Sequence, residues 1–550
     1  MKLFVRSCYI LGVKIYPGTT TRVGALLWGV WIAPILFAMI TPIPTWAQVF
    51  VAERHAIAEA ASGDEMITAF YRARDFEPIW TGADAAAIAR RGALLQALER
   101  AHNHALPTAR YDANALRETF RAASHPHARG LADVSATQAF LQYARDVHSG
   151  VLDPDDVVGD IVHTLPRRDP LDLLTDFLES NPRDFIAALP PRHPEYTRIM
   201  RTRLEMLSLA ESGGYGPTVR ADRLVPGDSG PNVVALRNRL LAMGFLGRSV
   251  TATYDASIQQ AVMAFQGANG IDPSGLADTT TLRAINRTVE DHLGELALAL
   301  ERQRWLNVDR GDRHIFVNIT DFHTRVIDDG QVTFITRSVV GADERGRRTP
   351  EFSDMMEHMV INPSWYVPRS IARRSYIPRI LAGRGTYMEV SRGGRVVNPA
   401  NVDWSRYSVN NFPFSLRQRP GPRNALGQVK FMFPNPWNIY LHDTPERDLF
   451  NREVRTYSSG CVRLQDPFDF AYHLLAVQED DPESYFDMIL NTRRETRVDL
   501  DEHVPVHITY WTAWVSPDGR LNLRNDIYGR NAALIRALQA AGVDIGAVSS

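Results

Sequence analysis

Cysteine is almost absent from this 550-residue chain, which contains only Cys8 and Cys461. Two thiols are too few for a disulfide-stabilised scaffold or for a cysteine-rich metal site. An excess of charge is also missing, because the net charge is −2 and gives no global preference for nucleic acid. Hydrophobic residues make up 45% of the chain, enough for several buried cores, and its length corresponds to roughly two to four domains.

Acidic residues are missing from the first 52 positions, where four basic residues occur. Residues 23–40 are an uninterrupted apolar stretch, followed by the small residues Thr45 and Ala47 at the −3 and −1 positions of a cleavage site. This pattern predicts a signal peptide over residues 1–47. The alternative is an uncleaved inner-membrane anchor, because residues 23–40 reach the length needed to span a bilayer. Both interpretations predict that the chain from Gln48 onward is exported to the periplasm.

Cys461 is then the one thiol of the exported part, since Cys8 belongs to the targeting segment. In an oxidising compartment a single cysteine cannot form a disulfide within its own chain. Cys461 is therefore expected to be either a buried, unreactive thiol or a thiol whose reactivity serves the protein's function.

Hydrophobic periodicity changes along the chain and predicts an α+β multidomain protein. Residues 48–218 place apolar side chains at i, i+3, i+4 and i+7, for example in ATQAFLQYARDVHSG, and we expect a helical scaffold domain there. Residues 219–290 contain three short helical patterns separated by turns. Residues 291–540 alternate as strands do, for example in HIFVNITDFHTRVID, and predict a mainly β domain that carries an inserted segment.

The short helical zone contains the segments LVPGDSGPNVVALRNRLLAMGFLG, YDASIQQAVMAFQGANGI and ADTTTLRAIN, and through them it resembles the three-helix peptidoglycan-binding module. One position departs from the module's pattern, because Asp278 stands where a glycine is usual before the last helix. Most matched residues are core or turn positions, so they support the fold, while both peptidoglycan binding and a structural spacer role stay open. The matched residues are Gly227, Gly230, Val233, Leu236, Tyr254, Asp255, Ala261, Val262, Phe265, Gln266, Thr281, Leu282 and Asn286.

Cys461 has a candidate base in His442, which lies 19 residues earlier in the segment NIYLHDTP. A base is needed because a free cysteine has a pKa of about 8.5 and attacks as the thiolate. If residues 439–442 form a strand, Tyr440 and His442 share one face of it. Gly460 permits a sharp backbone turn, so that successive N–H groups can converge as an oxyanion hole requires.

The residues after Cys461 predict the start of a helix, with Asp466 as N-cap and Pro467 as the first helical residue. Cys461 lies five residues before this cap, too far for the helix dipole to be its main activator, so activation is assigned to His442. The spacing alone does not establish catalysis. A lone cysteine is most often a small buried apolar residue, and a lone histidine is most often a hydrogen-bonded polar one.

The combination of IYLHDTP with SSGCVRLQDP resembles the catalytic signature of YkuD-type L,D-transpeptidases, in which a histidine precedes an S-[HS]-G-C-x-[RN] sequence. Longer segments are similar to the large, scaffold-bearing YcbB-like subfamily: FYRARDFEPIW, INPSWYVPRSI, RQRPGPRNALGQVKFMFPN and DIYGR. The resemblance covers roughly residues 60–535 and includes all three zones in order. Many YkuD domains have a histidine where this chain has Ser459, but the scaffold-bearing subfamily accepts serine there.

This resemblance implies roles for individual residues and requires no cofactor or metal. Cys461 would be the nucleophile, and His442 the base that also protonates the leaving amine. Backbone N–H groups of Ser459, Gly460 and Cys461 would stabilise the tetrahedral oxyanion. The candidate substrate-binding residues are Tyr440, Ser458 and Arg463.

The reaction that the resemblance implies is acyl transfer between two peptidoglycan tetrapeptide stems. The thiolate attacks the diaminopimelate carbonyl of the donor and expels D-alanine, and an amine of the acceptor's diaminopimelate then resolves the thioester into a 3-3 cross-link. The same resemblance implies acylation of Cys461 by carbapenems, a role in cell-wall biogenesis and cell shape, and contacts with other cell-wall enzymes.

Arginine is concentrated between Arg369 and Arg423, where eleven arginines face only two acids, Glu389 and Asp403. The related enzymes place a capping subdomain over the active site in this region, and we expect the insertion to span about residues 366–423. The arginines are either a solvated basic surface or ligands for the free carboxylates of the stem, for which guanidinium groups are well suited.

Other functions fit the sequence less well. A sortase-like enzyme has a different sequence around its cysteine, and a cell-wall cysteine endopeptidase has its cysteine before its histidine. A non-enzymatic wall-binding scaffold would not need the pair formed by His442 and Cys461. L,D-carboxypeptidase action and the anchoring of proteins to the wall stay open.

Overall fold

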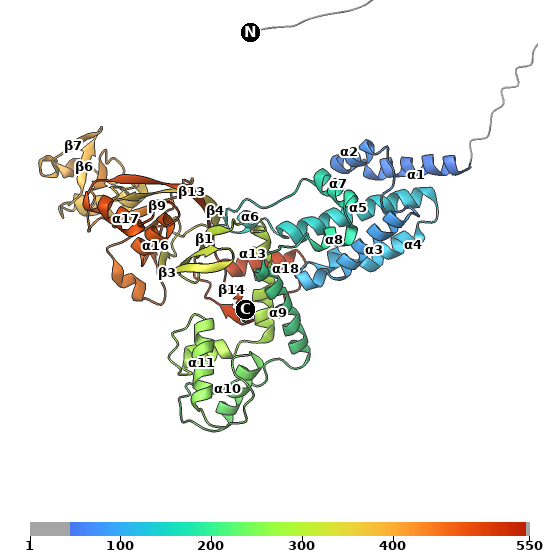
Figure 1. The fold of residues 1–550 in the computed structure, drawn as a ribbon, viewed down its shortest axis with the longest axis horizontal. Helices are drawn as coiled ribbons and strands as arrows, with labels where there is room; N and C mark the ends of the chain where they lie inside the picture. Colours follow the sequence, from blue (N-terminus) through green and yellow to red (C-terminus); the bar gives the residue numbers. More distant parts are fainter. Residues whose placement is uncertain (1–44, 546–550) are drawn as a thin grey trace, which may run out of the picture. The chain divides into compact units, whose positions relative to one another are not determined.

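The computed structural model describes the backbone of residues 45–545 (Figure 1). The chain divides into a unit Met1–Val49 and a unit Phe50–Ser550. The first helix, α1, spans Thr45–Ala61. The predicted signal or anchor at 23–40 and Cys8 lie outside the described residues. Within residues 45–545, no helix is both long and apolar enough to cross a membrane.

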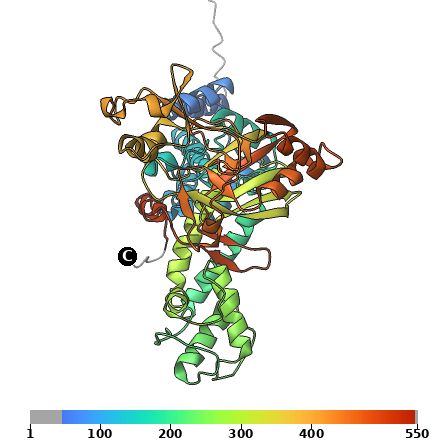
Figure 2. The same ribbon diagram turned by 90° about the vertical axis from the view of Figure 1, so that its left-hand side faces the viewer.

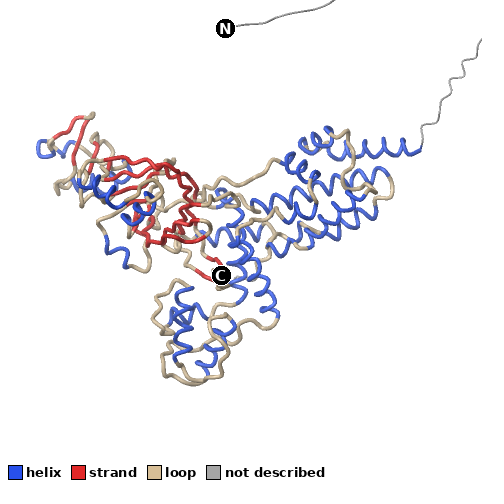
Figure 3. The backbone as a smooth tube through the Cα atoms, in the orientation of Figure 1, coloured by secondary structure: helices blue, strands red, loops and turns tan. Residues whose placement is uncertain are grey.

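Helices and strands are segregated along the chain, which confirms the predicted α+β class. All described elements from α1 to α13 are helices, and strands begin only after residue 312 (Figure 3). The helices of the N-terminal region are α2 (Glu65–Ala73), α3 (Ala85–Glu99), η1 (Ala101–His104), η2 (Thr108–Arg110), α4 (Ala113–Ala122), α5 (Pro126–Ser149), α6 (Pro154–Val157), α7 (Pro170–Glu179), α8 (Pro182–Ala187) and α9 (Pro194–Glu211).

A buried carboxylate on α5 organises this helical region. Asp133 is fully buried, and its oxygens accept hydrogen bonds from the backbone amides of Ile79, Trp80 and Thr81 at 2.7–3.0 Å. The hydroxyl of Tyr71 donates to the same carboxylate at 2.6 Å. Because several donors satisfy this one charge, the loop after α2 is held against the helical core.

Residues 219–290 contain three helices with a core of their own: α10 (Pro231–Ala242), α11 (Ala256–Ala268) and α12 (Thr279–Ile285), drawn in green in Figures 1 and 2. Asp278 is the N-cap of α12, where its side chain accepts a hydrogen bond from the amide of Thr281 at 2.8 Å. Its backbone is extended, so a glycine is not required there, and Gly275 supplies the left-handed turn of the loop with φ +69°. The unusual Asp278 is therefore compatible with the three-helix fold.

A largely buried helix, α13 (Val289–Trp305), follows the three-helix bundle. It packs along α9 and carries the fully buried ion pair of Glu301 and Arg304 at 2.6 Å. Because α13 is buried on most of its circumference, it is a central core helix of the unit Phe50–Ser550.

Nine strands of the described chain form one sheet in the order β11-β3-β12-β10-β9-β4-β13-β1-β2. β2 also pairs with β3, so the row of strands closes on itself and leaves few unpaired edges. The strands are β1 (Arg313–Asn318), β2 (His323–Asp328), β3 (Gln331–Gly341), β4 (Phe352–Ile361), β9 (Val429–Met432), β10 (Leu441–His442), β11 (Thr456–Ser458), β12 (Val462–Leu464) and β13 (Thr496–Thr509).

Helices α16 (Pro467–Leu475) and α17 (Pro482–Asn491) contribute to the main core of this sheet. The predicted helix start at Pro467 is confirmed, but the side chain of Asp466 does not cap it; instead Asp466 accepts a hydrogen bond from the hydroxyl of Thr336 at 2.8 Å. A small hairpin of β14 (Ala513–Val515) and β15 (Leu521–Leu523) and the helix α18 (Arg530–Ala540) complete the C-terminal part.

The residues between β4 and β9 form a small subdomain with a separate core, which we call the cap. Its sheet contains β5 (Trp365–Tyr366), β6 (Glu389–Arg392), β7 (Arg395–Val397) and β8 (Ser415–Gln418). Its helical turns are α14 (Arg369–Ile371), the π-helical turn η3 (Ala372–Tyr376), α15 (Ile377–Leu381), η4 (Pro399–Asn401) and η5 (Trp404–Arg406).

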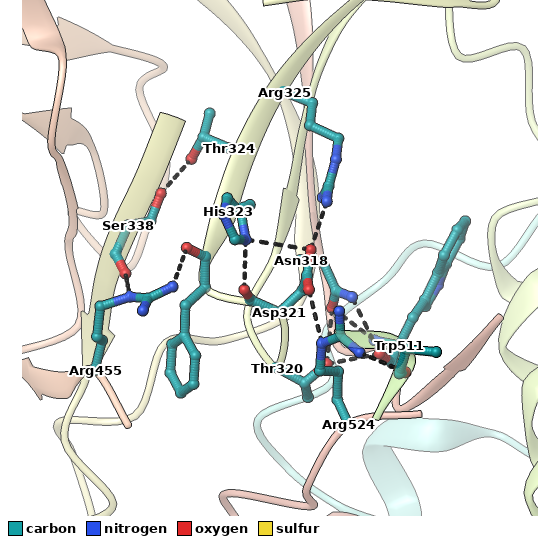
Figure 4. A network of polar contacts seen from close by, with 12 residues as sticks. Asn318, Thr320, Asp321, His323, Thr324, Arg325, Ser338, Arg455, Trp511 and Arg524 are labelled. Atoms are coloured by element: carbon teal, nitrogen blue, oxygen red, sulfur yellow. Dashed lines mark hydrogen bonds and ion pairs between the residues drawn. The ribbon is translucent and has the colours of Figure 1, made fainter. Parts of the chain in front are cut away.

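A polar network stabilises the end of the sheet next to the three-helix bundle. Figure 4 shows His323, Arg325 and Arg524 converging on the buried Asp321, with Arg325 and Arg524 at 2.5 and 2.7 Å. Burial alone would raise the pKa of Asp321, but these three partners lower it well below its usual range. Arg524 also donates to the carbonyl of Ala268 at 2.9 Å, so the same guanidinium contacts the end of α11.

Asp321→Ala should lower the free energy of unfolding by about 3–5 kcal/mol, because the guanidinium groups of Arg325 and Arg524 would lose their buried carboxylate. Asp499→Ala is the matched control, since the side chains of Asp499 and its partner Arg497 are 67% and 57% exposed and the pair should contribute less than about 1 kcal/mol. Urea unfolding of the two variants measures the difference. Equal effects would show that the network in Figure 4 adds little stability.

Candidate active site

Strand pairing places the candidate nucleophile and base on one face of the sheet. β10 pairs in parallel with β12, with Leu441 opposite Val462 and His442 opposite Arg463. Leu441 and Val462 belong to the main core, so the alternation of side chains directs His442 and Cys461 to the opposite face. Ile439 belongs to the same core as Leu441, as expected, but β10 itself spans only Leu441–His442 and Tyr440 is partly packed against this core as well.

His442 is oriented by a backbone acceptor. Its Nδ1 lies at hydrogen-bond distance from the carbonyl oxygen of Asp443, so the ring is a neutral imidazole that donates from Nδ1 and leaves Nε2 as a base. Burial, reinforced by the charge of Arg463, lowers the pKa of His442 to about 3. The imidazole is therefore unprotonated at neutral pH and free to accept a proton.

Cys461 is half-buried, with its Sγ 3.6 Å from the carbonyl oxygen of Asn438. Burial raises the pKa of the Cys461 thiol to about 11, although hydrogen bonds from Tyr440 and the charges of Arg463 and Lys430 act in the opposite direction. The resting site therefore holds a thiol and a neutral imidazole. A nucleophile at this position would therefore have to form by loss of the thiol proton during attack rather than beforehand.

The loop that carries Cys461 depends on a glycine. Gly460 has φ +121°, and a Cβ there would approach Cδ1 of Ile439 to 3.0 Å. The buried Ser458 holds the turn from within, because its hydroxyl accepts from the amide of Gly460 at 3.0 Å and donates to the carbonyl of Cys461. The backbone amides of Ser459 and Cys461 have no hydrogen-bond partner among residues 45–545, which leaves them available to an incoming oxyanion.

Thr349 clamps this loop from a neighbouring segment. Its hydroxyl donates to the carbonyl oxygen of Gly460 at 2.7 Å and accepts from the amide of Gly341 at 2.9 Å. Arg347 adds two hydrogen bonds to the carbonyls of Tyr457 and Ser458 at 3.0 and 3.2 Å. The orientation of the Gly460 peptide, and with it the position of Cys461, is thus fixed by residues more than 100 positions earlier in the sequence.

The clamp is itself fixed by the C-terminal segment DIYGR. The hydroxyl of Tyr528 donates to the carbonyl of Gly341 at 2.6 Å, and Arg530 donates to the carbonyl of Thr349 at 2.9 Å. Arg530 also forms a buried ion pair with Glu351 at 2.7 Å. The sequence marks DIYGR only as part of a family resemblance, and no local pattern gives these residues a role.

The helical region contributes to the same segment. Residues 160–162 run beside Glu351, whose amide donates to the carbonyl of Asp160 and whose carbonyl accepts from the amide of Val162, both at 2.9 Å. The scaffold region therefore supports the segment that carries Thr349.

The remaining predicted site residues differ in whether their side chains are free and exposed enough to contact a substrate. Tyr440 lies beside Cys461 and packs against both the main core and the core of the cap. Arg463 is paired with Glu446, so its guanidinium is occupied by a carboxylate in this structure. Ser458 is buried and bonded within its own loop, whereas Ser459 is exposed. Its exposure leaves Ser459 accessible to a ligand from the cap side.

Family profiles match three parts of the chain. The profile described as "L,D-transpeptidase catalytic domain" (YkuD) matches residues 312–500, which include both His442 and Cys461. The profile "Scaffold domain" matches residues 65–202, and the profile "Putative peptidoglycan binding domain" matches residues 229–285.

A protein of Haemophilus influenzae named "Putative L,D-transpeptidase" is 35% identical over 237 residues, which are 42% of this chain and 47% of that protein. The match thus spans about half the length of this relative. A crystal structure of residues 123–326 of the L,D-transpeptidase from Xylanimonas cellulosilytica is 14% identical and covers 53% of this chain and 98% of that chain. Its TM-score of 0.16 is too low to indicate a shared overall arrangement.

Alkylation of Cys461 by iodoacetamide should accelerate about tenfold per pH unit between pH 7 and 10, because burial holds the thiol pKa near 11. The Cys8→Ser chain is the material for this measurement, since Cys461 is then its single thiol. The Cys8→Ser, Cys461→Ser chain gives the background rate. A plateau reached by pH 8 would contradict the high thiol pKa.

Thr349→Val should shift the alkylation profile of Cys461 toward the ordinary thiol pKa of about 8.5, because a loosened loop would expose the sulfur to water. The same change leaves the buried Gly460 carbonyl and Gly341 amide without partners and should lower stability by about 1–3 kcal/mol. Thr349→Ser keeps the hydroxyl and should retain both the profile and the stability. An unchanged profile in Thr349→Val would show that the clamp does not position the nucleophile.

Proposed function

We propose that this chain is an L,D-transpeptidase with a YkuD-type catalytic domain and that it forms 3-3 cross-links in peptidoglycan through a Cys461 acyl-enzyme. The observation that carries this proposal is the pairing of β10 with β12, which brings a neutral His442 and the thiol of Cys461 to one face beside two unpaired amides. The peptidoglycan-binding domain at residues 229–285 supports peptidoglycan as the substrate.

In the first half-reaction, Nε2 of His442 accepts the thiol proton while Sγ of Cys461 bonds to the diaminopimelate carbonyl carbon of the donor stem. The amides of Ser459 and Cys461 donate to the resulting oxyanion. The amide of Gly460 could join them only by leaving the hydroxyl of Ser458. The C–N bond to D-alanine then breaks, and His442 returns the proton to the departing amine, which leaves a thioester.

In the second half-reaction, the side-chain amine of diaminopimelate in an acceptor stem attacks the thioester. His442 takes a proton from that amine, the C–S bond breaks, and Cys461 recovers its proton. Attack by water instead would release a tripeptide, which is L,D-carboxypeptidase action, and attack by a protein amine would anchor that protein to the wall. A non-enzymatic wall-binding scaffold would not need this pair.

The proposal also assigns a cellular compartment to the protein and a role to each of its domains. The chain from Gln48 acts in the periplasm, either soluble after cleavage at Ala47 or held at the inner membrane by residues 23–40, alongside other cell-wall enzymes. Residues 48–218 form the scaffold, 219–290 the peptidoglycan-binding module and 291–540 the catalytic domain, with a capping insertion at about 366–423.

Incubation with disaccharide-tetrapeptides, followed by mass spectrometry, should give dimers that have lost one D-alanine. Cys461→Ala should abolish this product, and His442→Ala should reduce the rate by about 10²–10⁴-fold because the general base is removed. A tripeptide without dimer would establish carboxypeptidase action instead. Substantial cross-linking by Cys461→Ala would refute the nucleophile.

A carbapenem serves as a second probe of the same nucleophile, because its strained carbonyl can acylate a thiol without an acceptor stem. Intact-protein mass spectrometry of the Cys8→Ser chain should show one adduct, which is absent in the Cys8→Ser, Cys461→Ala chain. An adduct that persisted without Cys461 would place the reactive group elsewhere.

A further inference from the structure

The structure separates the eleven arginines of residues 369–423 by their partners. Five of them have partners inside the cap: ion pairs with carboxylates, a backbone carbonyl or an aromatic ring. These five are Arg369, Arg392, Arg406, Arg417 and Arg419. Five of the eleven arginines are therefore already engaged within the cap.

Arg374 differs from the other cap arginines because it reaches the loop of the nucleophile. Its Nη2 lies 3.3 Å from the hydroxyl oxygen of Ser459, two residues before Cys461. No carboxylate lies within ion-pair distance of Arg374 among residues 50–545, and the side chain is exposed. A guanidinium carries five N–H donors, so a single long contact with a neutral hydroxyl leaves most of its capacity unused.

The backbone places Arg374 at this position for a local reason. Pro378 lies four residues later, and in a regular α-helix its ring would collide with the carbonyl of Arg374. The chain avoids this collision by the π-helical turn η3, in which the amide of Ile377 donates to the carbonyl of Ala372 five residues earlier. Such turns are rare and occur frequently at functional sites.

Aromatic side chains connect this part of the cap to the candidate nucleophile. Tyr376, at the end of η3, packs edge-on against Trp365 with ring centroids 6.0 Å apart. Tyr440 packs against the cap core that contains Trp365, and it also lies beside Cys461. Arg374 and Tyr440 therefore reach the neighbourhood of Cys461 from the cap and from the sheet.

We propose that Arg374 is a substrate-binding residue that holds a free carboxylate of the donor stem next to the scissile carbonyl; this inference rests on the proposed function. The donor offers this chemistry from two sources, the terminal carboxylate of D-alanine and the side-chain carboxylate of diaminopimelate. Either would form a bidentate ion pair with the guanidinium, and the hydroxyl of Ser459 lies close enough to donate a further hydrogen bond.

Three synthetic donors test the proposal: the free tetrapeptide, one amidated at the terminal D-alanine and one amidated at the diaminopimelate side chain. Arg374→Gln should lower kcat/KM for the free donor about 10–100-fold, mainly through KM, because a charge-assisted pair is lost. The kcat/KM of Arg374→Lys should lie between the values for the wild type and for Arg374→Gln, since lysine keeps the positive charge but not the planar guanidinium. Arg395→Gln, on β7 of the same cap, removes an equal charge and should match the wild type.

The amidated donors identify the carboxylate that is bound. When the carboxylate that Arg374 binds is amidated, the kcat/KM of the wild-type enzyme should fall by about the same 10–100-fold. On that donor Arg374→Gln should cause no further decrease in kcat/KM. An equal loss on all three donors would mean that Arg374 only closes the cap, and it would overturn the proposal. Wild-type behaviour of Arg374→Gln on every donor would overturn it as well.

A binding measurement separates this inference from the proposed function. In the Cys461→Ala background, which cannot form a thioester, titration calorimetry gives the Kd of each intact donor with and without Arg374→Gln. A wild-type enzyme that released no D-alanine from any donor would refute the proposed function. Donor binding that was independent of Arg374 would refute the role of Arg374, whatever the enzyme's activity.

Discussion

The parallel pairing of β10 with β12 is the constraint on which the candidate active site depends. Two short strands meet in a register that sets Leu441 against Val462 inside the core. Because side chains alternate along a strand, burying these two residues forces His442 and Cys461 to share the opposite face. A shift of one residue in this register would turn His442 into the apolar core and Leu441 out of it, so the hydrophobic core that stabilises the sheet also sets the geometry of the candidate pair.

Much of the candidate catalytic pair could be predicted from the sequence, because its geometry is set by residues close to it in the chain. The apolar positions at 439 and 441, the glycine before Cys461 and the proline that starts α16 each act within a few residues, and the strand faces, the φ of Gly460 and the helix start all follow them. The α+β class was equally visible in the change of periodicity. The sequence pattern of residues 219–290 was likewise sufficient to predict the three helices α10, α11 and α12.

The remainder of the site could not be predicted because it depends on contacts that are distant in sequence. Thr349, Tyr528 and Arg530 fix the nucleophile loop through hydrogen bonds that span more than 100 residues, and no local pattern marks them. The protonation states also required the structure, since the pKa values of Cys461 and His442 are dominated by burial. Arg374 was one of eleven equivalent arginines until the turn imposed by Pro378 placed it beside Ser459.

Tyr528 and Arg530, which hold the Thr349 clamp in place, lie late in the sequence, and this has a consequence for the order in which the protein is made. During synthesis, His442 and Cys461 emerge from the ribosome well before DIYGR, the last segment to join the site. A nascent chain that already contains both reactive side chains still lacks the supports that hold Gly341 and Thr349 in place. A chain that ended before Tyr528 would therefore contain His442 and Cys461 without the hydrogen bonds that hold Gly341 and Thr349.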